Sequence, residues 1–174
     1  WELVALANRH PRVNILQPGP GVGGHCIAVD PWFIVAKTPE QAHLIRAARE
    51  VNDSKPEWVI DQVKIKIVEF LQANPEKTIK DVTVACYGLA FKPDIDDLRE
   101  SPALEITNKL AEQGLNVLAI EPNIQNLPAS LCKHIQLLSA NQSIEADVHL
   151  ILVKHKEFKS LNINSDKVIN ICGL

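Results

Sequence analysis

The sequence predicts an α/β fold in which a long helix precedes a small parallel sheet. In the second half, short β-branched and aliphatic runs alternate with a helical pattern, as in Val82–Tyr87, Pro102–Glu112 and Asn116–Ile120. Strand–helix–strand alternation is typical of βαβ units, whose strands lie parallel. In the first half, apolar residues repeat at helical spacing from Leu44 to Leu71. At 174 residues the chain is long enough for one good core or for a domain with an appendage.

The helical part begins with Trp1–Ala7, which has the pattern of the last turns of a helix. Thr38–Gln41 has the pattern of a capping box with proline at the first helical position, and Ser54–Glu57 has the pattern of a second box. The sequence therefore predicts one kinked helix or two helices in series. About 30 helical residues would span about 45 Å, enough to bridge domains or pair subunits, although two locally packed helices are the alternative.

In the second half we expect a helix capped by Ser101, with Pro102 in its first turn and Gly114 at its stop. The polar stretch from 74 to 78 separates this half from the long helix. The remaining expected elements are two strands, Val148–Val153 and Lys167–Ile171, and two weak helical stretches, Gln142–Ala146 and one near Glu157.

Composition and charge exclude several classes of protein. Lys and Arg total 18 against 21 for Asp and Glu, and no basic run is interleaved with aromatics, so we do not expect a nucleic-acid partner. Apolar runs such as Val148–Val153 are too short to cross a bilayer, and the N-terminus lacks the pattern of a signal peptide. These features predict a cytoplasmic protein that has no membrane partner.

Four cysteines are widely separated and form no C-x-x-C pair, so neither a disulfide framework nor a zinc site is expected. Cys86, Cys132 and Cys172 are expected in the core. The chain begins at Trp1 and contains no methionine, which predicts that it is a portion of a longer protein.

Cys26 follows a glycine-rich turn and has the sequence context of a nucleophile. A thiol reacts as the thiolate, and backbone N–H groups freed by glycine, together with a short helix opening at Cys26, would stabilise that anion. Asp30 stands at i+4 on the same helical face, where a carboxylate could orient water or pass protons. The alternative is a buried structural thiol. The glycines of this turn are Gly19, Gly21, Gly23 and Gly24.

Two other interpretations of the turn are less favoured. Gly19–Gly24 formally satisfies the dinucleotide fingerprint G-x-G-x-x-G, but Pro31 interrupts the following helix and Leu44 stands where an acidic residue belongs. A thiol hydrolase would need a histidine base. His25 is adjacent to Cys26, so we expect the two side chains to point apart.

A second functional loop, residues 88–102, follows the first strand of the expected sheet. It is longer than the usual βα connection, and ligands of parallel sheets bind at the carboxyl ends of strands. Lys92 and Arg99 could bind phosphate or carboxylate oxygens. The loop's acidic residues could hold these cations or bind sugar hydroxyls: Asp94, Asp96, Asp97 and Glu100. The alternatives are a solvated charged loop and, less favoured, a metal site of the three aspartates; we expect no metal.

The segments Gly19–Pro31 (GPGVGGHCIAVDP) and Gly88–Pro102 (GLAFKPDIDDLRESP), joined by a long helix, resemble the UDP-glucose/GDP-mannose dehydrogenase family. The histidine before the cysteine and the Asp-Pro-Trp after it resemble the branch that acts on UDP-N-acetylhexosamines. The resemblance covers nearly the whole chain and is weakest after Ser139. It implies an active-site segment (1–37), a central dimerisation helix (38–73) and a Rossmann-like UDP-sugar-binding domain (74–174), with the N-terminal NAD-binding domain absent from this chain.

The resemblance implies an NAD-dependent oxidation of UDP-N-acetyl-D-mannosamine at C6 to the uronate, by two hydride transfers. Such a reaction would serve surface polysaccharide synthesis, for instance of enterobacterial common antigen. A thiol can hold the aldehyde as a thiohemiacetal and then as a thioester that water releases. By resemblance, Cys26 is the nucleophile and Asp30 assists proton transfer or hydrolysis.

The resemblance also implies which residues bind substrate and cofactor. The four glycines would line the sugar and phosphate, Phe91 and Lys92 would contact the nucleotide sugar, and Arg99 would reach the NAD pyrophosphate. The basic residues that would reach a neighbouring subunit's substrate are Arg9, His10 and Arg12. Val29 departs from UDP-glucose relatives, which often have lysine there and use it as a cofactor contact.

We expect a homodimer through the central helix. Without the NAD-binding half, we expect this chain alone not to turn over. The alternative function is a non-catalytic nucleotide-sugar-binding or dimerisation module.

Overall fold

The structure is a computed structural model that describes residues 1–131, 133–139 and 145–174. Its centre is a five-stranded, all-parallel sheet with the strand order β3-β2-β1-β4-β5. The α/β fold with a parallel sheet is therefore confirmed. The strands are β1 Thr83–Tyr87, β2 Asn116–Ile120, β3 Gln136–Leu138, β4 Val148–Ile151 and β5 Val168–Asn170.

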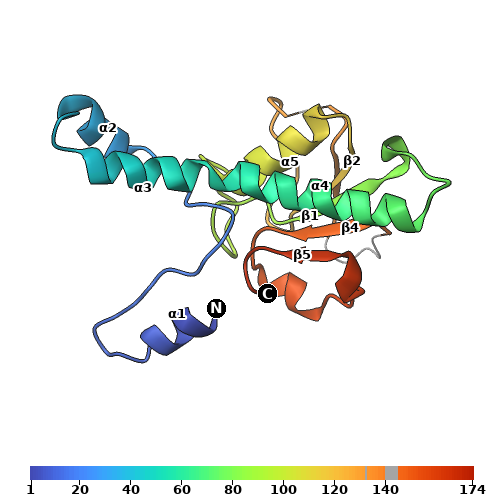
Figure 1. Cartoon of the computed structure of the whole chain (residues 1–174), viewed down its shortest axis with the longest axis horizontal. Coiled ribbons are helices and arrows are strands. Elements are labelled where there is room, and N and C mark those ends of the chain that lie inside the picture. Colours follow the sequence, from blue (N-terminus) through green and yellow to red (C-terminus); the bar gives the residue numbers. More distant parts are fainter. Residues whose placement is uncertain (132, 140–144) are drawn as a thin grey trace.

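Two helices in series form the long helical part (Figure 1). α3 ends at Asp53 and α4 begins at Lys55, so only Ser54 separates them. The α-helices are α1 Glu2–Ala7, α2 Asp30–Lys37, α3 His43–Asp53, α4 Lys55–Ala73 and α5 Pro102–Glu112, and the 3-10 turns are η1 Ile79–Asp81, η2 Lys156–Ser160 and η3 Ser165–Lys167. Figure 1 shows α4 lying along the sheet while α3 extends beyond it and carries α2 near its far end.

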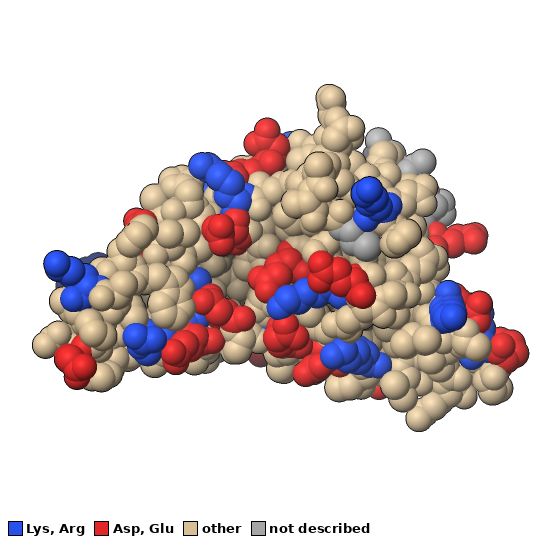
Figure 2. Space-filling view, turned by 90° about the horizontal axis from the view of Figure 1, so that it is seen from above, with Lys and Arg blue, Asp and Glu red and all other residues tan. Residues whose placement is uncertain are grey.

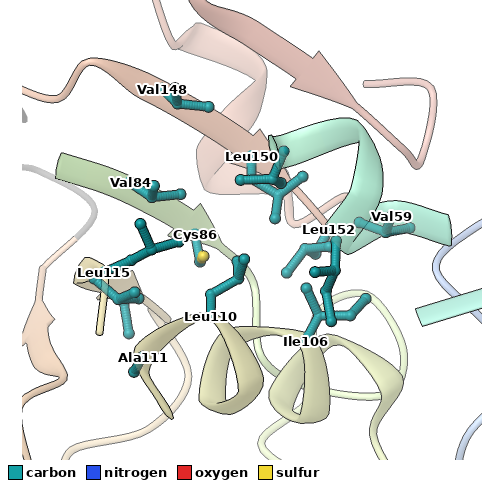
Figure 3. Packing of buried hydrophobic residues seen from close by; sticks show 14 of the residues in the cluster. Val59, Val84, Cys86, Ile106, Leu110, Ala111, Leu115, Val148, Leu150 and Leu152 are labelled. Carbon is teal, nitrogen blue, oxygen red and sulfur yellow. The ribbon is translucent and has the colours of Figure 1, made fainter. Parts of the chain in front are cut away.

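The main core lies between the sheet and the helices α4 and α5 (Figure 3). Val59 and Val63 of α4 are fully buried one helical turn apart. Figure 3 shows Ile106 and Leu110 of α5 directed at the strands, where Cys86 of β1 is buried. Because α4 packs into this core, its position relative to the strand ends is fixed.

A smaller apolar cluster covers the opposite face of the sheet. The Tyr87 hydroxyl lies 2.9 Å from Nδ1 of His149, and the Tyr87 ring meets Phe158 edge-on with centroids 5.5 Å apart. Burial raises the pKa of Tyr87 to about 12 and lowers the pKa of His149. Both groups are therefore held neutral in this cluster at neutral pH.

Helix α5 forms as the sequence predicts. The Ser101 hydroxyl accepts a hydrogen bond from the N–H of Leu104 at 3.3 Å and donates one to the C=O of Leu89 at 2.6 Å. Pro102 occupies the first turn, and Gly114 has a φ of +85° just after the helix ends. The same serine thus caps the helix and ties it to the end of β1.

Both predicted capping boxes are wrong, because each hydroxyl closes the preceding helix instead. Thr38 donates its hydroxyl to the C=O of Ile34 at 2.9 Å, and α3 begins only at His43. Ser54 donates to the C=O of Val51 at 2.8 Å and makes no side-chain cap for α4.

The other differences are small. The short edge strand β3 was not expected from the sequence, and β4 and β5 are shorter than predicted. The weak helix expected at 142–146 falls mostly outside the described residues, as does Cys132. The stretch near Glu157 is the 3-10 turn η2.

Candidate active site

Two loops lie side by side at the carboxyl edge of the sheet: the cysteine loop, residues 17–29, and the strand-end loop, residues 88–101. The N–H of Gly24 donates to the C=O of Arg99 at 3.1 Å, which joins them directly. On its other side the cysteine loop is held by α3, since the N–H of Val22 donates to Oδ1 of Asn52 at 2.8 Å. The contact places the two segments singled out in the sequence in one site.

Glycine lets the two loops pack this closely. A Cβ on Gly23 would overlap the carbonyl oxygen of Glu100 and lie 2.8 Å from Cβ of Phe91. Gly24 has a φ of +90°, and its Cβ would lie 3.0 Å from the Phe91 ring. Gly21 also has a positive φ, whereas a Cβ on Gly19 would meet no atom within 4 Å. The expected backbone freedom is therefore used at Gly21 and Gly24, and close packing is the reason for Gly23.

Cys26 is exposed, so the interpretation as a buried structural thiol is wrong. No helix opens at Cys26: α2 begins at Asp30, and the C=O of Cys26 accepts the N–H groups of Val29 at 3.0 Å and Asp30 at 2.8 Å. Pro31 explains the later start, because proline is favoured in the first turn of a helix. The helix dipole therefore begins one turn beyond the sulfur.

The side chain of His25 does not point away from Cys26, contrary to expectation. Its Nδ1 lies 2.9 Å from Sγ of Cys26. Residues 24–26 form a bend rather than a strand or helix, so the alternation of neighbouring side chains that holds in a strand does not apply there. The site thus contains a thiol–imidazole contact that sequence reasoning rejected.

Arg99 and Asp97 form a two-point ion pair beside this contact. Nη2 of Arg99 lies 2.6 Å from Oδ2 of Asp97, and Nε lies 3.0 Å from Oδ1. The hydrogen bonds from Arg99 lower the pKa of Asp97 to about 2, with a smaller electrostatic contribution from His25. The pKa of Arg99 is raised mainly by Asp97 and also by Cys26. The expectation that loop acids hold the loop cations is therefore confirmed for Asp97.

A cavity of about 370 Å³ opens between the cysteine loop and the strand-end loop, at the ends of β1 and β4. It brings Gly19 and Gly21 of the cysteine loop against Phe91 and Lys92 of the strand-end loop. Cys26, Asp30 and Arg99 do not line it. The full lining is Gln17, Pro18, Gly19, Pro20, Gly21, Ala90, Phe91, Lys92, Pro93, Pro102, Ala103, Leu152, Val153, Lys154 and Cys172.

Beneath the strand-end loop lies a buried pair, Glu121 and His155, which sequence reasoning missed. Oε2 of Glu121 accepts the N–H groups of Leu89 at 2.7 Å and Ala90 at 3.1 Å, and it lies 3.0 Å from Nε2 of His155. Nδ1 of His155 accepts the N–H of Asp94 at 2.9 Å. The segment that carries Lys92 is therefore anchored on both sides.

Hydrogen bonding keeps Glu121 ionised although it is only 2% exposed. Burial, the largest single cause, would raise its pKa, but bonds from His155, Leu89 and Asn123 together lower the pKa below its ordinary value. The sequence feature that could have identified Glu121 is its position directly after the buried strand β2. In dinucleotide folds an acid at the end of the second strand binds ribose, but here the Glu121 carboxylate accepts the backbone N–H groups of Leu89 and Ala90 instead.

A third buried residue missed by the sequence analysis, Arg49 of α3, supports the cysteine loop. Its side chain donates to the C=O of Ile27 at 3.3 Å and to Asp53 at 2.7 Å. Arg49 is 8% exposed, and its partner Ile27 follows Cys26 directly. α3 therefore holds the cysteine loop at two points, Val22 and Ile27.

The basic residues after α1, Arg9, His10 and Arg12, lie in an exposed stretch. Asn8 closes this stretch by bonding both the N–H of Ile15 at 2.6 Å and its C=O at 3.0 Å. Within the part of the chain that the structure describes, no hydrogen bond joins these basic residues to either loop of the site.

The described residues contain one group with metal-ligand chemistry, Asp94, His155 and Glu157, whose ligand atoms lie within 4.8 Å of one another. Nδ1 of His155 already accepts the N–H of Asp94, and Nε2 contacts Glu121. The group therefore has no free imidazole nitrogen. It also differs from the three-aspartate site that was the less favoured expectation.

The surface agrees with the charge balance of the sequence. Figure 2 shows Lys and Arg side chains interspersed with Asp and Glu over the face that it draws. On α5, Lys109 pairs with Glu105 at 2.8 Å and with Glu57 of α4. Among the described helices, none combines the length and apolar character needed to cross a membrane.

Comparison with protein families matches both halves of the chain to one family. Residues 1–54 match the central domain of the UDP-glucose/GDP-mannose dehydrogenase family. Residues 85–170 match the UDP binding domain of the same family.

Curated relatives and solved structures agree. The chain is 58% identical over 164 residues to the UDP-N-acetyl-D-mannosamine dehydrogenase of Escherichia coli (strain K12), covering 93% of this chain and 39% of that protein. The identity to the enzyme of that name from Campylobacter jejuni is 56%, covering 99% of this chain and 40% of the relative. The chain thus spans about two fifths of the length of these relatives.

Among solved structures, the UDP-N-acetyl-mannosamine dehydrogenase of S. aureus superposes with a TM-score of 0.66 at 40% identity, covering 97% of this chain and 37% of that one. The fold, the two matched domains and the paired loops agree with one another. The chain therefore belongs to the UDP-glucose/GDP-mannose dehydrogenase family, with its central-domain sequence at residues 1–54 and its UDP binding domain at residues 85–170.

Proposed function

We propose that this chain is part of an NAD-dependent nucleotide-sugar 6-dehydrogenase that oxidises UDP-N-acetyl-D-mannosamine to UDP-N-acetyl-D-mannosaminuronate. The single observation that carries the proposal is the exposed Cys26 thiol beside the loop that bears Lys92 and Arg99. A thiol buried in the core and remote from that loop would have contradicted it. The names of the similar proteins support the choice of substrate.

In this proposal NAD, when bound, accepts the hydride removed from C6. Of the described residues, Arg99 is the one we assign to the NAD pyrophosphate, because its guanidinium is exposed at the edge of the site. Glu121, the acid at the usual ribose position, is occupied by backbone. The remaining cofactor contacts are therefore assigned to parts of the whole protein other than this sheet.

Cys26 is proposed to hold the reacting carbon. Its sulfur adds to the C6 aldehyde, so the aldehyde stays bound between the two oxidations. Asp30, which begins α2 one turn after Cys26, is proposed to orient the water that releases the carboxylate. Val29 leaves the neighbouring position without the lysine that UDP-glucose relatives often have.

The cavity between the loops is the proposed UDP-sugar site. Lys92 supplies a cation for phosphate oxygens, and Phe91 supplies an aromatic face. Gly19 and Gly21 bring the backbone to the cavity wall, while Gly23 and Gly24 hold the wall in place. Arg9, His10 and Arg12 are proposed to reach the substrate of a neighbouring subunit.

We propose a homodimer formed through the long helix. Its exposed face carries apolar side chains at intervals of seven residues: Leu44, Val51, Trp58 and Ile65, which are 83%, 72%, 48% and 54% exposed. Apolar residues at this interval form a helix-packing seam. The division into 1–37, 38–73 and 74–174 is retained as a proposal, as is a cytoplasmic role in surface polysaccharide synthesis such as that of enterobacterial common antigen.

The dimer is tested by native mass spectrometry of this chain. The double substitution Leu44→Glu and Val51→Glu in α3 is expected to give monomers, while Lys64→Glu in α4, outside the seven-residue repeat, leaves the mass distribution unchanged. A dimer that survives the double substitution would contradict the seam.

The function is tested in the full-length protein with Cys26→Ser. We expect no uronate, while Cys86→Ala, which removes a thiol buried in the core of the sheet, still yields product. Wild-type amounts of uronate from the Cys26→Ser protein would overturn the proposal. The alternative, a non-catalytic UDP-sugar-binding or dimerisation module, predicts no dinucleotide-binding domain encoded upstream and no NADH from the full-length protein.

A further inference from the structure

We infer that His25 is the proton acceptor for the Cys26 thiol, which makes it a catalytic residue of the proposed reaction. This inference rests on the proposed function for its chemical purpose. Its geometric basis is the distance of 2.9 Å between Nδ1 of His25 and Sγ of Cys26. At that distance the thiol can donate directly to the ring nitrogen, and no water is needed between them.

The backbone around His25 is fixed by the contacts of its neighbour, Gly24. The N–H of Gly24 donates to the C=O of Arg99, and a Cβ added at Gly24 would lie 3.0 Å from the Phe91 ring. After Cys26, Arg49 holds the C=O of Ile27. The residues on both sides of the pair are thus anchored, so the approach of imidazole to sulfur is favoured by the surrounding packing.

The charged groups nearby favour the transferred state. Proton transfer converts the pair into imidazolium and thiolate. The Asp97 carboxylate interacts with His25, and the Arg99 guanidinium interacts with Cys26. Asp97 and Arg99 are hydrogen-bonded to each other, so both stay in place. The negative charge of Asp97 favours the imidazolium of His25, and the positive charge of Arg99 favours the thiolate of Cys26.

The addition step balances with His25 alone. The S–H proton moves to Nδ1, and the sulfur electron pair forms a bond to the aldehyde carbon. The π pair of the C=O bond moves to oxygen, which then takes the proton from the imidazolium. The product is a thiohemiacetal and neutral histidine, so the step consumes no other reactant.

Hydrolysis of the later thioester uses the same nitrogen. His25 takes a proton from water as the water oxygen bonds to the carbonyl carbon, and it returns that proton to the departing sulfur. The products are the carboxylic acid and the free thiol. An imidazole suits both steps because its ordinary pKa lies near neutral pH, whereas a carboxylate is a much weaker base.

The pair is testable in this chain without turnover, by measuring the rate of Cys26 alkylation with iodoacetamide from pH 5 to pH 9. Cys132→Ser in all proteins removes the thiol at that position. Burial raises the pKa of Cys86 to about 12 and that of Cys172 to about 11, so these thiols do not compete. The test variant is His25→Asn and the control is His43→Asn, at the exposed start of α3.

At pH 6.5 the His25→Asn chain should react about tenfold more slowly than the wild type, because its thiol has lost the neighbouring proton acceptor. The two rates should converge towards pH 9, and His43→Asn should follow the wild type. Superimposable profiles for His25→Asn and wild type would overturn the inference.

The result separates this inference from the proposed function. Suppose that His25→Asn shifts the pH profile of Cys26 alkylation but full-length Cys26→Ser still makes uronate. Then proton transfer from Cys26 to His25 is supported, and the dehydrogenase role of Cys26 is wrong. If the profiles superimpose and Cys26→Ser makes none, the nucleophile stands and the role of His25 falls.

Discussion

The two loops of the site are held in place by different means. The strand-end loop rests on buried charge: Glu121 and His155 accept its backbone N–H groups at both ends of the Lys92 segment. The cysteine loop is held mainly by close packing, because its glycines have no Cβ and so can approach Phe91 and Arg99. One loop is thus part of the sheet's hydrogen-bonded interior, and the other is a surface segment packed onto it.

Under the proposed function, this difference would separate effects on UDP-sugar binding from effects on the thiol. The position of Lys92 is determined by buried hydrogen bonds, which are costly to break. The position of Cys26 depends on contacts at an exposed boundary between two segments. We therefore expect changes beneath the sheet edge to act on stability first, and changes at the glycine contacts to act on the sulfur first.

The largest effect is expected from Glu121→Ala. It leaves His155 and two backbone N–H groups buried without their acceptor, which should cost about 3–5 kcal/mol in the free energy of unfolding. Urea unfolding followed by circular dichroism measures the loss. Glu76→Ala, at an exposed carboxylate, is the control and should stay within about 0.5 kcal/mol of wild type. A loss below about 1 kcal/mol for Glu121→Ala would show that the anchor is not needed.

A smaller loss, about 1–3 kcal/mol, is expected from Gly23→Ala, because the new Cβ overlaps the Glu100 carbonyl and crowds Phe91. Gly19→Ala is the matched control, since its Cβ meets no neighbour within 4 Å. The same two proteins should differ in the pH profile of Cys26 alkylation, with only Gly23→Ala departing from wild type. Equal behaviour of the two variants would contradict the packing role of Gly23.

Lys92→Ala tests whether the two loops act separately. Loss of one charge-assisted contact should weaken UDP binding about tenfold, measured by calorimetry on this chain. The alkylation profile of Cys26 should not change. Lys80→Ala, in the exposed turn η1, should bind UDP as the wild type does. Altered Cys26 reactivity in the Lys92→Ala chain would show that the loops are coupled.

The smallest effect concerns acid stability. Burial lowers the pKa of His149, so folding favours its neutral form, and the folded-state pKa lies below the ordinary value of 6.5. Its contribution to stability is therefore complete above pH 6.5 and is lost as the pH falls through the lower folded value. The melting temperature should drop between pH 7.5 and pH 5, and less so in His149→Gln. An equal drop in both proteins would assign the acid sensitivity to other groups.

Local patterns predicted the elements whose determinants are local. The strand and helix patterns around β1, β2 and α5, and the cap by Ser101, could be predicted because neighbouring residues decide them. Thr38 and Ser54 each lie between two helices. The sequence pattern does not show whether the hydroxyl caps the following helix or bonds to a carbonyl of the preceding one, and in the structure it does the latter.

The site residues that were missed depend on distant or irregular partners. Glu121 bonds backbone groups at Leu89 and Ala90, far away in the sequence, which no local pattern reveals. His25 was dismissed by an argument about neighbouring side chains that applies to regular structure, whereas it lies in a bend after Gly24. Cys26, Lys92 and Arg99 were selected for their chemistry, and the structure brings their two loops together.

The paired helices α3 and α4 have one further consequence. α4 is built into the sheet's core, while α3 holds the cysteine loop through Asn52 and Arg49. The two helices therefore set the distance between the Cys26 sulfur and the edge of the sheet, and Ser54 is the residue that separates them. Bending at Ser54 would move the cysteine loop relative to the edge of the sheet, and it would therefore strain the Gly24–Arg99 hydrogen bond that joins the two loops.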